Sequence, residues 1–440
     1  MSYLRRLLLA TGILPKTPRE PFYKTVLRAL PTIVIITAIM FVLDMLGWLR
    51  GFETAAIDGM LMVKRSPAAS QIVIVTIDNE DYRTLFGGKS PIDPDALEEL
   101  LSAIAKGKPA VIGVDLDTTA PQFAAPKWPP AVWARDADLT TEDDAEAASP
   151  GLHAVIEYLV RLPVLGGAMQ EKLDDGQITT VPKSGLVVFP QDFDGVVRRY
   201  RREYLSDKAD PPSELEGEVD TLPWAMVKEY AAYLRARQKG DSAECKRIDS
   251  LERQGKAHEL VLNFAGDRYH FDRIAARHIL AGSQATFWPD NAPVRDMIVL
   301  VGGTYRTARD EYVTPVGRMY GVELIAQAIE SDLRGGGIRE VNRIVAMVLE
   351  CGMSLVLLYV NWRFPSRYMP TISIATIFGL SLVGSFLAFN AFAYWFNFTA
   401  VLVSTWIHLL WEQAKERREL RREVESLRLK LAAGAAGPAS

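Results

Sequence analysis

Four long apolar segments alternate with polar sequence along the chain. They are Ala29–Trp48, Ile344–Trp362, Tyr368–Phe389 and Phe392–Trp411. Each has about the 20 residues that a helix needs to cross the hydrocarbon core of a bilayer, and aromatic residues lie at several of their ends, as at membrane interfaces. The pattern predicts transmembrane helices over residues 29–49, 343–362, 368–389 and 392–411. The long basic leader before the first one favours an uncleaved anchor over a signal peptide.

The charges predict how these helices are oriented. Residues 51–342 carry 33 Lys and Arg against 46 Asp and Glu, whereas the rest of the chain carries 17 against 8. Four spans place every basic cluster on one side of the membrane. We therefore expect a multi-pass protein of a bacterial inner (plasma) membrane, with residues 1–28 and 412–440 cytoplasmic and residues 50–342 periplasmic or extracellular. An acidic middle excludes nucleic-acid binding, which needs a concentrated basic face.

The outer segment has the alternation of strands and helices of an α/β domain. The β-branched run Gln71–Asp78, the amphipathic segment Ala96–Lys106 and the apolar run Ala110–Asp115 predict a β-α-β unit with a parallel strand pair. Further strands are expected at Gly185–Phe189, Val196–Tyr204, Glu259–Phe264 and Met297–Val301, and helices at His153–Arg161, Leu222–Arg237 and Tyr320–Leu333. The predicted fold class is an extracytoplasmic α/β domain with a mixed, mainly parallel sheet and loop insertions, plus four transmembrane helices and a short C-terminal coiled coil.

The coiled coil is inferred from the spacing of four apolar residues near the C-terminus. Leu420, Val424, Leu427 and Leu431 are separated by four, three and four positions. This is a heptad seam, which only a partner helix can bury. The seam predicts a homodimer or a higher homo-oligomer.

Candidate ligand-binding residues follow the strands of the outer domain. Asp78 and Asp115 each end a predicted strand, Asp117 comes two residues later, and Thr304 and Asp310 follow the strand at Met297–Val301. Ligands of open α/β sheets bind beyond the carboxyl ends of the strands, and carboxylates there suit a cation, an amine, a hydroxyl-rich ligand or a proton. The alternative is that each acid caps the helix or turn that follows it.

Two other patterns allow chemical interpretations. Val111–Thr119 is similar to the nucleophile loop of haloacid-dehalogenase-type phosphatases, in which Asp115 would attack phosphorus and Asp117 would act as acid/base beside magnesium. The Lys and the later paired acids of that chemistry are not evident, so we expect no enzyme. The sequence also predicts no cofactor and no metal site, since it has two cysteines and five histidines. Arg198, Arg199, Arg201 and Arg202 would hold an anion or form a solvated face paired with acidic loops.

The last helix of the outer domain leads toward the second membrane span, so we expect it to transmit a structural change from the domain to the membrane helices. Gly317 and Gly321 bracket its start, and Glu323 lies in its first turn. Glu350 lies in the middle of the second span, where a carboxylate is costly and indicates function. The alternative is a protonated Glu350 that is hydrogen-bonded inside the helix bundle.

The order of these motifs resembles the type-2 CHASE domain, a sensory module of bacterial signalling proteins. The matching blocks are Ile74–Asp78, Ile112–Asp115, Phe193–Arg199, Leu262–Gly266, Val299–Thr304 with Asp310, Thr314–Gly317 and Gly321–Glu323, and three closely spaced apolar segments follow them. The resemblance implies a sensor. In that family an output domain usually follows the last helix, whereas Glu412–Ser440 alone remain here, so we expect an effector in trans or a truncated sensor.

The sequence thus favours a transmembrane sensor that passes an extracytoplasmic signal to a cytoplasmic effector. Its expected partners are membrane lipid, further copies of itself and that effector or a complex subunit. A structural membrane subunit that docks partner proteins is the alternative, and a magnesium-dependent periplasmic phosphatase is a less favoured one.

Overall fold

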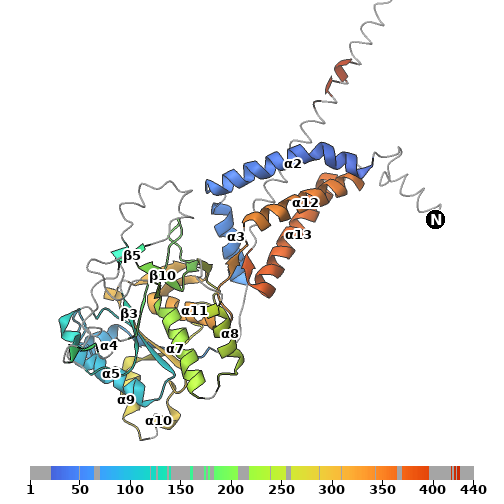
Figure 1. Ribbon diagram of the computed structural model, residues 1–440. Helices are drawn as coiled ribbons and strands as arrows, with labels where there is room; N and C mark the ends of the chain where they lie inside the picture. The colour runs from blue at the N-terminus through green and yellow to red at the C-terminus, as the bar shows by residue number, and fades with distance from the viewer. Residues whose placement is uncertain are drawn as a thin grey trace, which may run out of the picture. The chain divides into compact units, whose positions relative to one another are not determined.

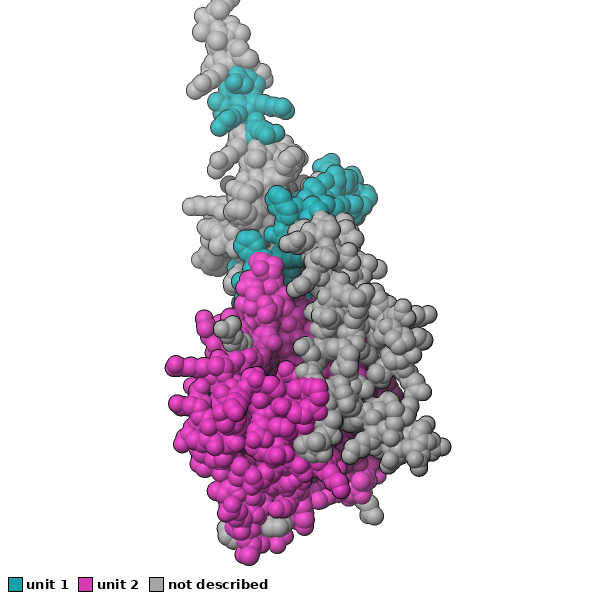
Figure 2. Space-filling view, turned by 90° about the vertical axis from the view of Figure 1, so that its left-hand side faces the viewer, with its two compact units in different colours: residues 1–57, 340–440 teal, residues 58–339 magenta. Residues whose placement is uncertain are grey.

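The computed structural model describes residues 21–395 except 49, 64–69, 119, 125–126, 136–137, 140–158, 162–172, 175–176, 179–182, 207–217, 238, 254–258, 287, 309, 342 and 364–368, and in addition residues 418, 421–422 and 424–426. The chain forms two compact units, which Figure 2 colours separately. We call residues 58–339 the central unit and residues 1–57 with 340–440 the terminal unit. The chain therefore enters the central unit at Asp58, within helix α3 (Arg50–Val63), and leaves it at Arg339, within strand β17 (Arg339–Glu340).

A six-stranded parallel sheet forms the middle of the central unit. Its strands, in spatial order, are β13 (Asp272–Ala275), β1 (Ile72–Ile77), β14 (Ile298–Gly303), β2 (Val111–Asp115), β3 (Val132–Arg135) and β8 (Ser184–Leu186). All five neighbouring pairs run parallel. Every residue of β1 and β14 is buried, as expected of continuous apolar strands that are covered on both faces. The α/β class and the mainly parallel sheet are confirmed.

The order of the strands corrects one expectation. β1 and β2 run parallel, but β14 lies between them, since Leu300 is the register partner of both Ile74 and Gly113. All residues of β14 are buried, as are those of β1, and β14 takes an interior position of the sheet. That choice depends on competition among strands distant in sequence, which the local pattern does not reveal.

Helices cover the two faces of the sheet (Figure 1). α5 (Pro94–Lys106) and α9 (Ala276–Ser283) pack together over one face, and α7 (Leu222–Ala236) and α11 (Gly321–Leu333) over the other, with α8 (Ala243–Arg253) against both of the latter. A Cβ atom on Gly113 would lie 2.2 Å from Met226 Sδ, and one on Gly302 would lie 2.6 Å from Val322 Cβ. Glycine at these positions lets α7 and α11 approach the sheet. All residues of α11 are buried, which is typical of a core helix.

Shorter elements complete the central unit. They are α4 (Asn79–Thr84), α10 (Trp288–Asn291), β4 (Asp138–Leu139), β5 (Leu159–Arg161), β6 (Leu173–Asp174), β7 (Gln177–Ile178), β9 (Arg199–Tyr200), β10 (Glu203–Ser206), β11 (Glu218–Asp220), β12 (Leu260–Val261), β15 (Glu311–Thr314), β16 (Gly317–Tyr320) and the 3-10 turns Pro121–Ala124 and Arg306–Ala308. The expected helix His153–Arg161 is wrong at its end, because Leu159–Arg161 is strand β5 between β4 and β10. Its earlier residues lie outside the described part.

The terminal unit contains helices α2 (Phe22–Met45), α12 (Arg343–Arg363) and α13 (Met369–Phe392) and strand β18 (Tyr394–Trp395). α12 packs against both α2 and α13. The three helices overlap the first three expected spans, although α2 begins seven residues before the expected start at residue 29. By length and hydropathy no single helix among the described residues qualifies as a membrane span, whereas the two parts of α2, Phe22–Pro31 and Ile33–Met40, qualify together across a 41° bend. Pro31 accounts for such a bend.

The C-terminal expectations fall mainly outside the described residues. Tyr394–Trp395 of the fourth expected span form β18, and residues 396–411 are not described. Of the heptad residues, Val424 lies in a short helical piece and is exposed. Leu420, Leu427 and Leu431 lie outside the described part, so the coiled coil stays a prediction.

Candidate functional site

Two of the predicted site residues, Asp115 and Asp310, meet at the carboxyl edge of the sheet. Asp115 is the last residue of β2, and Asp310 follows the adjacent strand β14. Burial raises the pKa of Asp115 to about 8, and the negative charge of Asp310 adds to this rise. Burial also raises the pKa of Asp310, although hydrogen bonds from Tyr312 and Gly321 oppose the rise. Near neutral pH the pair therefore holds a proton that isolated carboxyls would release.

Asp310 connects this acid pair to helix α11. The Gly321 N–H donates to the Asp310 carbonyl at 3.0 Å, and Gly321 is the first residue of α11. A Cβ atom on Gly321 would lie 2.0 Å from Asp310 Oδ2. Glycine is thus required here because the carboxyl group lies directly against the backbone at the start of the helix.

Asp78 takes the capping role that the sequence left as the alternative. Its Oδ1 accepts hydrogen bonds from the Glu80 and Asp81 N–H groups at 2.8 and 2.9 Å, at the start of α4. Its Oδ2 pairs with Arg277 at 2.7 Å. Although burial opposes it, the bonds from Asp81 and Arg277 lower the pKa of Asp78. Asp81, which sequence reasoning missed, is fully buried and pairs with the same guanidinium at 2.9 Å.

Thr304 and Asp117 lie at the same edge of the sheet as the acid pair. Thr304 extends the backbone pairing, since its N–H donates to the Ile77 carbonyl at 2.9 Å. Asp117 acts electrostatically on Tyr305, whose ring stacks on Tyr82 with 4.2 Å between centroids. Burial raises the pKa of Tyr305, and Tyr82 and Asp117 add to the rise. Among the predicted ligand residues, Asp310 thus acts electrostatically on Asp115.

The predicted coupling residues have separate roles. Gly317 adopts a left-handed φ of 118° in the hairpin of β15 and β16. Glu323 is fully buried, accepts the Tyr320 N–H at 2.9 Å and pairs with Arg273 at 2.7 Å, so it fixes the first turn of α11. Glu350 lies in α12, and its side chain is outside the described part. No group of three or more His, Cys, Asp and Glu suited to a metal ion occurs among the described residues.

Comparison with known proteins gives one match. The model of the CHASE2 domain family matches residues 33–384, which is most of the chain. The chain belongs to the CHASE2 domain family. CHASE2 is a family of sensory domains, typically extracellular ones of membrane proteins. No curated protein and no solved structure matches the chain.

One block of this CHASE2 domain was misjudged from the sequence. The arginines were expected to hold an anion or to form a solvated face paired with acidic loops, but Arg198 and Arg202 are 2% and 3% exposed. Both pair with carboxylates distant in sequence, Arg198 with Asp58 and Arg202 with Asp332, and Arg198 also pairs with the nearby acidic turn. The signal in the sequence is the period of two at Arg198, Tyr200 and Arg202, which is that of a strand with one buried face.

Proposed function

We propose that this CHASE2 protein is a transmembrane sensor that detects an extracytoplasmic signal and passes it through its membrane helices to a cytoplasmic effector in trans. The observation that carries the proposal is the position of α11. Its first residue, Gly321, lies against the Asp115–Asp310 pair, and its last turn leads to Arg339, where the chain leaves the central unit. A change of charge at the pair therefore acts on the element that connects to α12.

The membrane assignment rests on uncovered apolar surface in the terminal unit together with the basic clusters. Large apolar side chains are exposed on α2 and α12, namely Leu27, Leu30, Val34, Ile35, Ile39, Val42, Val345, Val348 and Leu349. In water such an apolar surface promotes aggregation, whereas a bilayer covers it. In our proposal residues 50–342 lie outside a bacterial inner membrane and both termini lie in the cytoplasm.

The signal acts, in this proposal, at the Asp115–Asp310 pair. The two carboxyl groups, both partly exposed, respond to the pH outside the membrane, and they also favour a ligand that carries positive charge. The energy for the response is the difference in affinity for the proton or ligand between two states of the domain. Asp78, which is engaged as a helix cap, contributes structure and not ligand contacts.

The output passes through the C-terminal residues 412–440. Leu420, Val424, Leu427 and Leu431 pair with a second copy of the chain, and the resulting coil presents a surface to the effector. Two heptads are short for a stable coil in solution, but attachment to membrane helices raises their effective concentration.

A mild-detergent purification of the full chain, with its mass measured by mass photometry, tests this proposal. We expect a dimer that carries a kinase, cyclase or other signalling enzyme. Val424→Lys places a charge on the seam and is expected to give monomers, whereas the neighbouring Glu425→Lys leaves the dimer intact. A monomeric wild-type chain without a partner would contradict the mechanism, and a fixed stoichiometric complex with a non-signalling protein would favour the structural subunit instead.

A further inference from the structure

A short extended segment, Val197–Arg202, divides its side chains between two faces. We call it the junction strand. Arg198, Tyr200 and Arg202 are buried, whereas Arg199 and Arg201 are partly exposed, which is the period of two of an extended chain. Its backbone is held on both sides by hydrogen bonds from Val197 N–H to Val313 O at 2.8 Å, from Leu262 N–H to Arg198 O at 2.8 Å and from Thr221 N–H to Arg202 O at 2.8 Å.

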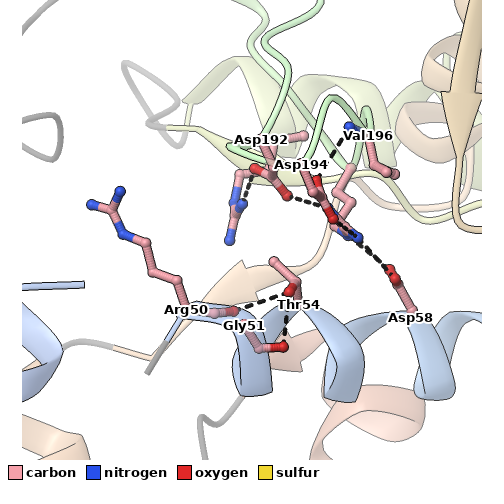
Figure 3. Close-up of polar contacts among 9 residues, drawn as sticks. Arg50, Gly51, Thr54, Asp58, Asp192, Asp194 and Val196 are labelled. Atoms are coloured by element: carbon pink, nitrogen blue, oxygen red, sulfur yellow. Dashed lines mark hydrogen bonds and ion pairs between the residues drawn. The ribbon is translucent and has the colours of Figure 1, made fainter. Parts of the chain in front are cut away.

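Arg198 of the junction strand binds the point of entry into the central unit. Arg198 donates from Nε and Nη2 to the two carboxyl oxygens of Asp58 at 2.7 and 2.8 Å. The carboxyl groups of Asp58, Asp192 and Asp194 converge on this guanidinium (Figure 3), with Asp192 at 2.9 Å and Asp194 at 2.8 Å. Although burial opposes it, the three carboxylates raise the pKa of Arg198. A bidentate pair of this kind fixes orientation as well as distance.

The next two buried residues bind the end of α11. The Tyr200 hydroxyl donates to Asp332 Oδ1 at 2.5 Å, and Arg202 donates to the same oxygen from Nε and Nη2 at 2.9 and 2.8 Å. Asp332 is fully buried in the last turn of α11. Burial raises the pKa of Asp332, while its contacts with Arg202 and Tyr200 oppose the rise. The guanidinium of Arg202 also lies 4.9 Å from the centre of the Trp224 ring, a cation–π contact.

The same two side chains contact the glycine turn through which the chain leaves. Gly336 has a φ of 104°, and a Cβ atom on it would lie 2.6 Å from Arg202 Nη2; one on Gly337 would lie 2.8 Å from Tyr200 Cε1. Ile338 then exchanges two backbone hydrogen bonds with Val261, at 2.9 and 2.8 Å, and Val261 is in turn the register partner of Arg199. The exit is thus bound to the junction strand by side chains and through β12.

We infer that the junction strand is a clamp that couples the entry of the chain into the central unit to its exit. Asp58 of α3 and Asp332 of α11 are held by alternate positions of one hydrogen-bonded segment, so displacement of α3 at Asp58 or of the last turn of α11 changes the contacts of the other. Coupling of this kind is reciprocal, because each site changes the free energy of the other by the same amount. The inference goes beyond the sensor function, since the clamp acts in the central unit whatever signal or effector the protein serves.

Hydrogen exchange of the full chain in detergent, measured by mass spectrometry at one pH, tests the clamp. Tyr200→Phe removes the hydroxyl that holds Asp332 and leaves every contact of Asp58 in place. Loss of one such bond corresponds to roughly a fivefold rise in exchange where local opening is coupled to it. We expect that rise at residues 332–338 and also at residues 58–63. Asp58→Asn is expected to raise exchange at residues 332–338 in return.

A surface pair of the same unit provides the matched control. Asp220→Asn weakens the ion pair with Lys228, whose nitrogen lies 2.7 Å from Asp220 Oδ1, and it should leave both segments unchanged. The clamp is contradicted when Tyr200→Phe alters residues 332–338 alone and Asp58→Asn alters residues 58–63 alone. It is equally contradicted when Asp220→Asn raises exchange at both segments, because the effect is then a general loss of stability.

Discussion

Two sets of carboxyl groups in the central unit differ in their partners. At the carboxyl edge of the sheet, the charge of Asp310 acts on the partly exposed Asp115, and desolvation raises the pKa of both carboxyl groups. At the junction strand, Asp58 and Asp332 each pair with a buried arginine. In the proposed function the first set is the one that responds to a proton or a cation, whereas the carboxylates of the second set are paired with arginines of the protein itself.

In the proposed function this difference separates detection from transmission. Because the pKa of Asp115 is raised to about 8, the acid pair has two charge states that are close in energy near that pH. A bidentate ion pair changes only when its helices move, because removal of one charge leaves the other buried and uncompensated. α11 connects the two sets, with Gly321 at the acid pair and Asp332 at the clamp.

The largest effect on stability is expected at the carboxylates that pair with arginines. Asp332→Ala leaves Arg202 and Tyr200 buried without their acceptor and should lower the free energy of unfolding of the central unit by about 3–5 kcal/mol. Urea unfolding of the full chain in detergent, followed by pulse proteolysis, measures this. Asp220→Ala, at a partly exposed pair, should cost under about 1 kcal/mol. Equal losses in the two variants would erase the distinction between buried and surface pairs.

The acid pair should show itself in the pH dependence of stability. The folded pKa of Asp115, about 8, exceeds the ordinary value of 3.8, so the folded state keeps a proton that the unfolded chain releases. Stability conferred by this group is complete below pH 4 and is lost as the pH rises toward 8. We expect a fall of roughly 3–4 kcal/mol between pH 5 and pH 8.

Two variants sharpen this expectation. Asp115→Asn should abolish most of the slope. Asp310→Asn removes the charge that helps to raise the pKa of Asp115 and should make the slope shallower. Thermal unfolding of the full chain at a series of pH values provides the curve, and a slope that is unchanged in Asp115→Asn would show that other groups titrate.

The contact between the acid pair and α11 predicts an intermediate effect. Gly321→Ala places a Cβ atom 2.0 Å from Asp310 Oδ2, and relief of this clash should cost about 2 kcal/mol. Gly59→Ala in α3 is the control, because nothing lies within 4 Å of its Cβ position, and alanine favours a helix. Chemical unfolding compares the two variants. If Gly321→Ala leaves the free energy of unfolding unchanged, Asp310 does not lie tightly against α11.

The smallest effect is expected at Asp78. Asp78→Ala removes the cap of α4 and should cost about 1 kcal/mol, whereas Asp78→Asn retains a capping side chain and should cost less. Thermal unfolding midpoints of the two variants measure the difference. Equal losses would mean that the charge opposite Arg277, and not the cap, gives Asp78 its role.

Local sequence patterns predicted helices and strands correctly where apolar and polar residues alternate regularly. β1, α5, β2, α7, β14 and α11 occur within about two residues of their expected bounds, because buried strands and amphipathic helices have distinct periods. The meeting of Asp115 and Asp310 also followed from the sequence, since the carboxyl ends of parallel strands share one edge. The placement of β14 between β1 and β2 did not follow, because strand order depends on distant segments.

The junction strand was missed for a related reason. Arginine is usually exposed, and a run of four arginines in five residues was accordingly expected to face solvent. Asp192 and Asp194, which also pair with Arg198, lie only six and four residues before it. Asp58 and Asp332, by contrast, lie 140 residues before Arg198 and 130 residues after Arg202, so their pairing is a property of the fold.

The claim that the acid pair acts on α11 is tested most directly by hydrogen exchange of the full chain on either side of pH 8, corrected for the intrinsic pH dependence of exchange. The account predicts that protection of residues 321–338 falls about tenfold as Asp115 ionises, and that Asp115→Asn abolishes this fall. Equal protection on both sides of pH 8 in the wild-type chain, or the same fall in Asp115→Asn, would contradict it.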